Sequence, residues 1–403
     1  MPVLINISEL NSCRDEGGQG DVHPIADAAL AWIDDRIEWV GPRRDLPAEY
    51  AAYEMMDAGG ALVVPGLIDC HTHLAFGGWR ADEFELRCRG TTYQEIAAAG
   101  GGILNTVEAT RAASEDDLVV RAGAFAREMM RLGVTTMECK SGYGLSTDEE
   151  RKLLRVYRRL AAELPVEIVP TFLGAHTVPP EYRDRRAAYV ELLCIEMIPG
   201  IAAEGLADFC DIFLETSAFT VSEAREVLNA GAAHGLRPKL HADQLTDGGG
   251  ALFASEVGAA SADHLEFASR EGMRAMAATG VVAVNLPIAS LYLRQPPLDA
   301  RAFIEEGVCV AVATDFNPGS APSYHLPLAM TLACTMSRMT PAEALKGATI
   351  YAARALNRAD RIGSLERGKR ADFVLVEASS VNHWLYHFRP NAVRAVYASG
   401  MRL

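Results

Sequence analysis

Hydrophobic and polar positions divide most of the chain into two kinds of segment that alternate from residue 61 onward. Short apolar runs with β-type composition are separated by longer stretches rich in Ala, Glu and Arg, which are typical of helices. The apolar runs cover 61–73, 134–144, 166–176, 207–215, 237–244, 258–266, 281–287 and 308–319. Helices are expected between them, for example over 115–132, 148–163, 186–204, 221–235 and 269–279.

This alternation predicts an α/β fold with a parallel sheet, and eight strand–helix units are the number that closes a TIM-like (β/α)8 barrel. An open doubly wound sheet is the alternative. The barrel is favoured because most runs end in a residue capable of chemistry, and active sites of such barrels lie at the carboxyl ends of the strands. These residues are His71, His73, Lys140, His176, Glu215, His241, His264 and Asp315.

The two ends of the chain have a different pattern, with short strand-like runs and turns. Residues 29–41, ALAWIDDRIEWVG, indicate two strands joined at Asp34–Asp35, and strand-like runs with glycine turns return after residue 357. We predict one discontinuous β-sandwich module built from residues 1–60 plus 358–403, with the barrel formed by 61–357. A separate carboxyl-terminal tail is the alternative.

Composition limits the partners of the protein. The chain has 403 residues and a formal net charge of −15, which repels phosphate backbones and anionic membranes, so nucleic-acid or membrane binding is not expected. An anionic substrate would then need a local cationic anchor. Eight scattered cysteines without a CxxC pair indicate reduced thiols and a cytoplasmic location. The first residues lack the pattern of a signal peptide, and no apolar run approaches the ~18 residues of a membrane span.

Two histidines in the stretch IDCHTHLAFGGWR, residues 68–80, are one residue apart. Side chains alternate along a strand, so His71 and His73 would point the same way. Together with His241 and Asp315 they would supply three nitrogens and one oxygen, a set that suits zinc or iron. Any one of these histidines alone would more simply be a hydrogen-bonded structural residue. Their joint position at strand ends predicts one divalent metal ion, Zn²⁺ or Fe²⁺/Fe³⁺.

Longer motifs in the chain resemble those of a known enzyme family. The chain contains PGLIDCHTHL and TDFNPG, which resemble the amidohydrolase superfamily, and a wider set resembles the imidazolonepropionases of histidine degradation over about residues 60–375. That set is FGGWRADEFELR, GGGILNTVEATR, KSGYGL, FLGAHTVPPEY, KLHADQL, SADHLE, ATDFNPG and ACTM. The resemblance implies metal-dependent hydrolysis of the cyclic amide of 4-imidazolone-5-propanoate to N-formimidoyl-L-glutamate, and it suggests a homodimer.

The resemblance also assigns roles to residues. His71, His73, His241 and Asp315 would hold a single metal, and His264 would act as general base or stabilise the oxyanion, sharing proton transfer with Asp315. Arg80 suits the substrate carboxylate, because its guanidinium is a planar two-pronged donor. The expected substrate-binding residues are Arg80, Tyr143, His176, Gln244, Asn317, Gly319 and Ser320, and Gln244 is expected beside His264 and Asp315 among the catalytic residues as well. We also expect the loop DFNPGSAPS to present backbone N–H groups to the ligand.

The alternative function within the superfamily is another mononuclear amidohydrolase, either a related cyclic amidase or a heterocycle deaminase. Two-metal relatives use a carboxylated lysine on the fourth strand, but here that run ends in Glu215, and Lys140 on the second is expected to pair charges. Deaminases place a glutamate three residues after the strand-five histidine, where this chain has Gln244, an amide that cannot shuttle protons. A metal-binding scaffold without catalysis is the alternative from another functional class. Strand seven departs from the family at three positions, Ile288, Ser290 and Leu291, which would affect substrate choice if they line the pocket.

Overall fold

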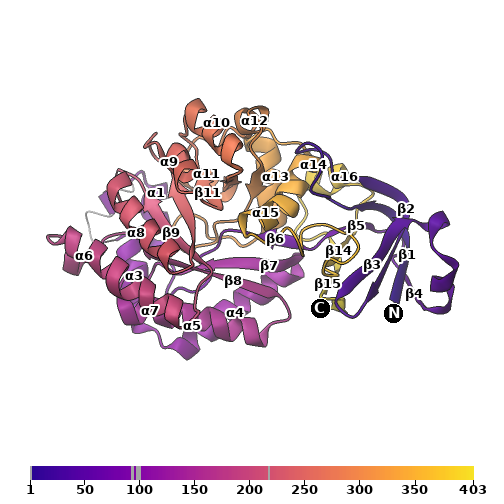
Figure 1. Ribbon diagram of the computed structural model, residues 1–403, viewed down its shortest axis with the longest axis horizontal. Helices are drawn as coiled ribbons and strands as arrows, with labels where there is room; N and C mark the ends of the chain where they lie inside the picture. The colour runs from indigo at the N-terminus through magenta and orange to yellow at the C-terminus, as the bar shows by residue number, and fades with distance from the viewer. Residues whose placement is uncertain (1, 92–94, 97–100, 217) are drawn as a thin grey trace.

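The protein forms two sheets of eight strands each in a computed structural model that describes residues 2–91, 95–96, 101–216 and 218–403. Figure 1 shows the larger helix-covered part on one side and a sheet that holds both chain termini on the other. In the motif that begins at residue 100, Gly100 lies outside the described residues.

The first sheet is parallel throughout, and each strand pairs with the next one along the chain. Backbone hydrogen bonds also join the segments that directly follow its first and last strands, from His73 N to Phe316 O at 2.9 Å and from Asp315 N to His71 O at 3.0 Å. The sheet is therefore the predicted barrel and not the open alternative. Its strands are β6 (Leu67–Asp69), β7 (Val134–Lys140), β8 (Glu167–Ala175), β9 (Phe209–Leu214), β10 (Arg237–Ala242), β11 (Ser261–His264), β12 (Val282–Asn285) and β13 (Val310–Val312).

Helices follow the barrel strands and cover their outer side (Figure 1). The predicted helical segment 186–204 is helical over residues 186–203, with a π-helical turn over Leu193–Met197 between two α-helical parts. The larger helices in the described part of the chain are α1 (Ala81–Cys88), α3 (Ile103–Ala112), α4 (Glu115–Arg131), α5 (Thr147–Glu163), α6 (Arg186–Leu192), α7 (Ile198–Ala203), α8 (Val221–Ala233), α9 (Gly250–Glu256), α10 (Arg270–Thr279), α11 (Pro287–Leu293), α12 (Ala300–Glu305), α13 (Leu326–Met336), α14 (Pro341–Gly347), α15 (Ile350–Ala355) and α16 (Val381–Tyr386). None of the helices in these described ranges is both long and apolar enough to span a bilayer.

The run 61–73, predicted as one barrel strand, is two strands in different sheets. Its first part, β5 (Leu62–Pro65), pairs with strands from both chain ends, and only β6 enters the barrel. The break falls at Pro65–Gly66. A Cβ on Gly66 would lie 2.2 Å from Thr135 Oγ1, so glycine allows the chain to pass closely over β7. Strand pairing with the terminal sheet thus continues to residue 65.

The second sheet contains segments from both ends of the chain, in the order β16-β15-β14-β5-β1-β2-β3, with β4 also beside β1. Its remaining strands are β1 (Pro2–Asn11), β2 (Pro24–Ile33), β3 (Arg36–Pro42), β4 (Glu54–Asp57), β14 (Phe373–Val376), β15 (Val393–Ala398) and β16 (Met401–Arg402). The turn between β2 and β3 lies at Asp34–Asp35, as expected, with Asp34 at φ 49°.

This terminal sheet, which joins segments from both chain ends as predicted, has a small apolar core of its own. Trp32 on β2 lies edge-on to Phe373 and Tyr397, with ring centroids 5.1 and 5.8 Å away, although two strands separate β2 from β14 in the sheet. These rings belong to an apolar cluster separate from that of the barrel.

Candidate active site

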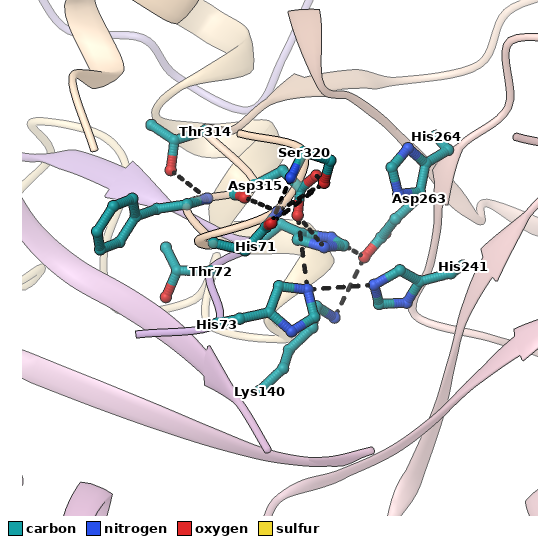
Figure 2. Close-up of polar contacts among 12 residues, drawn as sticks. His71, Thr72, His73, Lys140, His241, Asp263, His264, Thr314, Asp315 and Ser320 are labelled. Atoms are coloured by element: carbon teal, nitrogen blue, oxygen red, sulfur yellow. Dashed lines mark hydrogen bonds and ion pairs between the residues drawn. The ribbon is translucent and has the colours of Figure 1, made fainter. Parts of the chain in front are cut away.

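Four of the predicted side chains converge inside the carboxyl end of the barrel, where Figure 2 shows them turned toward one another. His71 and His73 follow β6, His241 lies on β10, and Asp315 follows β13. Oδ1 of Asp315 lies 3.3 Å from Nε2 of His71 and 3.5 Å from Nε2 of His73. Nε2 of His73 is in turn 3.4 Å from Nε2 of His241. All four residues are buried.

This donor set fits a metal ion. Nε2 of His71 is buried and makes no hydrogen bond to the described residues. The contact between Nε2 of His73 and Nε2 of His241 at 3.4 Å is a hydrogen bond only when one of the two nitrogens carries a proton; with both unprotonated, two lone pairs are left for an ion. Donor atoms of His71, His73 and Asp315 lie within 4.8 Å of one another, as do those of His71, His241 and His264. Burial lowers the pKa of His73 and of His241, which keeps these imidazoles neutral, the form that binds metals.

Two buried carboxylates that the sequence analysis missed brace these histidines from behind. Oδ2 of Asp263 lies 2.7 Å from Nδ1 of His71, and Oδ2 of Asp211 lies 3.1 Å from Nδ1 of His241. In metal sites such carboxylates fix the tautomer and ring orientation of the ligand, so that Nε2 is the nitrogen available to the ion.

Lys140, at the end of β7, joins the two braces. Its Nζ lies 2.7 Å from Asp211, 3.0 Å from Glu138 and 3.2 Å from Asp263, and Lys239 Nζ binds the other oxygen of Glu138 at 2.8 Å. Burial alone would lower the pKa of Lys140, but the surrounding carboxylates hold it well above its ordinary value. Lys140 is therefore a cation that pairs charges, as its position in the sequence indicates.

His264 ends β11 beside the four converging residues, with its ring centroid 5.5 Å from that of His241 and 5.8 Å from that of His71. The backbone is left-handed at His264 and at Leu265, with φ of 78° and 67°. Non-glycine residues adopt this region at a cost, and such strain concentrates at functional sites. On a regular strand His264 would point to the face opposite to that of Asp263. The left-handed turn lets the side chain of His264 lie at the site, directly after Asp263.

One wall of the site is aromatic. The His176 ring is stacked on His73 with centroids 5.2 Å apart, and the Tyr143 ring lies 5.7 Å from His73 and 5.5 Å from His176. Nδ1 of His176 is 3.1 Å from the carbonyl oxygen of Gly142, which orients the ring. Burial lowers the pKa of His176 to about 3, so the imidazole is neutral. Flat neutral rings of this kind can contact a planar heterocycle.

Arg80 lies beside the loop that carries Asp315, and its charge is partly balanced. Its guanidinium binds Glu83 at 2.6 and 2.8 Å, and Glu83 also accepts hydrogen bonds from Gly102 N and Asn105 Nδ2, both at 2.9 Å. The opposite edge of the guanidinium lies against Gly319, where an added Cβ would stand 2.0 Å from Nη1.

The loop after β13 does not present its amides as predicted. Oδ1 of Asn317 accepts hydrogen bonds from the backbone N–H of Gly319 and of Ser320, both at 2.8 Å, and Asn317 N donates to Ala321 O. The Asn317 amide also donates to the carbonyl oxygen of Asp315 at 2.7 Å. The expectation that these N–H groups face a ligand is wrong, because short polar side chains in turns bind the local backbone. The loop instead fixes Asp315.

Glu215 and Gln244 lie at neighbouring strand ends. Glu215 accepts hydrogen bonds from Leu245 N at 2.8 Å and Thr246 N at 3.2 Å and so holds the loop after β10. Gln244 begins that loop, three residues beyond His241, and is 9% exposed. A role for Gln244 toward substrate stays a prediction.

The three positions that depart from the family pattern lie on a helix and not on an extended strand seven. β12 ends at Asn285, and Pro287 begins α11, where proline is favoured. Ile288 and Ser290 are buried, while Leu291 is 51% exposed. Ser290 Oγ donates to Oε1 of Glu266 at 3.0 Å.

A signal for the bracing residues exists in the sequence. Charged residues stand inside otherwise apolar strands that end at the site, and buried charges require partners. The segments are ECK at 138–140, DIFL at 211–214, KLH at 239–241 and ADH at 262–264.

The chain is similar in sequence to known proteins over most of its length. The sequence pattern of the amidohydrolase family matches residues 62–403. An imidazolonepropionase from Cupriavidus necator is 48% identical over 379 residues, covering 94% of this chain and 91% of the relative. One from Pseudomonas fluorescens is 50% identical over 374 residues, covering 91% and 92%.

Solved structures resemble this chain in fold. Atrazine chlorohydrolase from Arthrobacter aurescens TC1, solved in complex with zinc, superposes with a TM-score of 0.77 at 17% sequence identity. The superposition covers 100% of this chain and 95% of that one.

Proposed function

The chain belongs to the imidazolonepropionases of the amidohydrolase family, and we propose that it hydrolyses the cyclic amide of 4-imidazolone-5-propanoate to N-formimidoyl-L-glutamate in histidine degradation. The observation that carries this proposal is the buried convergence of His71, His73, His241 and Asp315 beside the aromatic wall. It supports a hydrolytic centre next to a surface for a planar ring.

His71, His73, His241 and Asp315 would hold one metal ion at this centre, zinc or iron. Three nitrogens and one oxygen suit either metal. A second ion bridged by a carboxylated lysine is disfavoured, because the Lys140 ammonium is engaged by three carboxylates and is not a free amine. When bound, the ion lowers the pKa of a water molecule and polarises the ring carbonyl.

The chain's own residues handle the proton and the substrate. The oxygen of water bonds to the ring carbonyl carbon, the amide C–N bond breaks, and this carbon becomes a carboxylate of the product. His264 and Asp315 take the proton from water and return one to the departing ring nitrogen. Arg80 binds the propanoate carboxylate, and Tyr143 and His176 contact the ring. Gln244, Asn317, Gly319 and Ser320 complete the binding site, Gln244 through hydrogen bonds and the other three as the loop that holds Asp315.

The test is the spectrophotometric loss of imidazolonepropionate with metal-loaded protein. Arg80→Ala should mainly raise KM and His264→Ala should mainly lower kcat. Matched controls are Arg89→Ala and His234→Ala, since both side chains are exposed away from the site. Absence of turnover by the wild-type protein would reject the substrate. Ammonia release from an aminated heterocycle would favour a deaminase instead, which Gln244 disfavours.

Location and assembly belong to the same proposal. All eight cysteines are free thiols, four of them buried, which supports a cytoplasmic enzyme. We propose a homodimer, and the exposed side chains of Tyr386 (83%) and Phe388 (66%) are candidates for its interface. Light scattering on a sizing column tests the assembly, and a monomer at micromolar concentration would contradict it.

A further inference from the structure

Glu266 is a buried carboxylate at the active site to which the mechanism above gives no role. Its side chain is only 1% exposed. It follows the left-handed turn at His264 and Leu265, which is fixed by hydrogen bonds from Leu265 N to Ala242 O at 3.0 Å and from Phe267 N to Asp243 O at 2.9 Å. This strained turn brings the side chain of Glu266 back beside His264.

The carboxylate of Glu266 and the ring of His264 face each other there without a hydrogen bond between them. Oε1 of Glu266 lies 3.8 Å from Nδ1 of His264, and neither this Nδ1 nor Oε2 of Glu266 has a hydrogen-bond partner among the described residues. Buried polar groups without partners are rare and call for an explanation. A separation of 3.8 Å is too long for a hydrogen bond, but catalytic pairs are often long before substrate binds and then tighten.

Ser290 holds the carboxylate in place. Its buried hydroxyl donates to Oε1 of Glu266 at 3.0 Å, from α11. Ser290 is one of the three positions where this chain departs from the family pattern. Its hydroxyl fixes Glu266 toward His264, so the departure has a structural consequence at the catalytic side chain.

We propose that Glu266, held by Ser290, is the positioning residue for His264: it pairs with Nδ1–H of His264 and so keeps Nε2 as the nitrogen that exchanges the proton. This rests on the proposed function, in which His264 transfers a proton between water and the ring nitrogen. A carboxylate behind an imidazole selects the tautomer and stabilises the imidazolium while the proton is held. Gln244 cannot stabilise an imidazolium by charge, because its amide is neutral.

The kinetic test is a double-mutant cycle on the metal-loaded enzyme with Glu266→Gln, His264→Ala and both together. Glu266→Gln should lower kcat on the order of 10²-fold with little change in KM and with unchanged metal content. In the His264→Ala background the same substitution should cost less than about threefold, since Glu266 acts through His264. Ser290→Ala should give a smaller loss of kcat, and Glu271→Gln on the exposed start of α10 is the matched control. Equal losses in both backgrounds would overturn the proposal.

A second measurement does not depend on activity. NMR of isotope-labelled histidine in the zinc-loaded protein reports which ring nitrogen carries the proton, and the His264→Ala spectrum assigns the signal. We expect His264 to be protonated at Nδ1 in the wild type and to lose this preference in Glu266→Gln. A wild-type His264 protonated at Nε2 overturns the pairing. If the wild type fails to hydrolyse imidazolonepropionate, the proposed function fails, while this measurement still decides the pairing.

Discussion

Oδ2 of Asp263 lies 2.7 Å from Nδ1 of His71 and 3.2 Å from the ammonium of Lys140, and all three side chains are completely buried. Through Lys140 the same network reaches Asp211, which braces His241. Two proposed metal ligands from strands far apart in the sequence are therefore oriented by one shared cation. Each ligand ring is held before an ion arrives, which reduces the ordering that binding requires.

Removing the charge of Asp263 should weaken metal binding. We expect Asp263→Asn to lower the affinity for zinc about 10- to 100-fold, because the bracing carboxylate fixes the tautomer and basicity of His71. Competition with a chromophoric chelator measures this affinity. Asp184→Asn, at an exposed site, is the control and should retain wild-type affinity. An Asp263→Asn protein that holds zinc as tightly as the wild type would disprove the bracing role.

Removing the shared cation should destabilise the fold. Lys140→Met leaves Glu138, Asp211 and Asp263 in the barrel interior without their common partner. Breaking a buried ion pair from one side costs about 3–5 kcal/mol of unfolding free energy. Urea denaturation followed by circular dichroism gives this value, with the exposed Arg237→Met as the control. A loss below about 1 kcal/mol would show that the carboxylates find other partners.

The contact between Gly319 and Arg80 predicts a defect in substrate binding. A methyl group at residue 319 would lie 2.0 Å from Nη1 of Arg80, so Gly319→Ala displaces the guanidinium. We expect KM to rise about tenfold with kcat nearly unchanged, which corresponds to the loss of one charge-assisted hydrogen bond. Gly20→Ala is the control, because its Cβ would have room, with the nearest atom 3.7 Å away. A larger fall in kcat than in affinity would instead place Arg80 in the chemical step.

A surface ion pair should make stability depend on pH in a defined direction. Hydrogen bonds from Arg186 lower the pKa of Glu223 from 4.5 to about 2. Since the folded-state pKa lies below the unfolded value, this contribution is fully present above pH 4.5 and is lost as the pH falls toward 2. Urea midpoints of wild type and Glu223→Gln should therefore differ most near neutral pH and converge below pH 4.5. A difference that stays constant down to pH 2 would contradict this assignment.

The ligand residues of the site could be predicted from the sequence, but the residues behind them could not. The spacing of His71 and His73 and the positions of His241 and Asp315 at strand ends predicted a shared site, because parallel strands in a barrel all end at one rim. Nothing in local sequence places Asp263 behind His71, since the two are 192 residues apart along the chain.

By itself the sequence determined the eight-strand barrel, the convergence of its histidines and the family, because these follow from hydrophobic periodicity and from motifs that are local in the chain. Only the tertiary structure decided that the run 61–73 divides between two sheets, that Asn317 uses the amides of its own loop, and that Ser290 donates a hydrogen bond to Glu266. The physical reason is that a hydrogen bond between distant segments depends on distances of a few tenths of an ångström. Chain reversals such as the left-handed turn at His264 set these distances, and residue order alone does not.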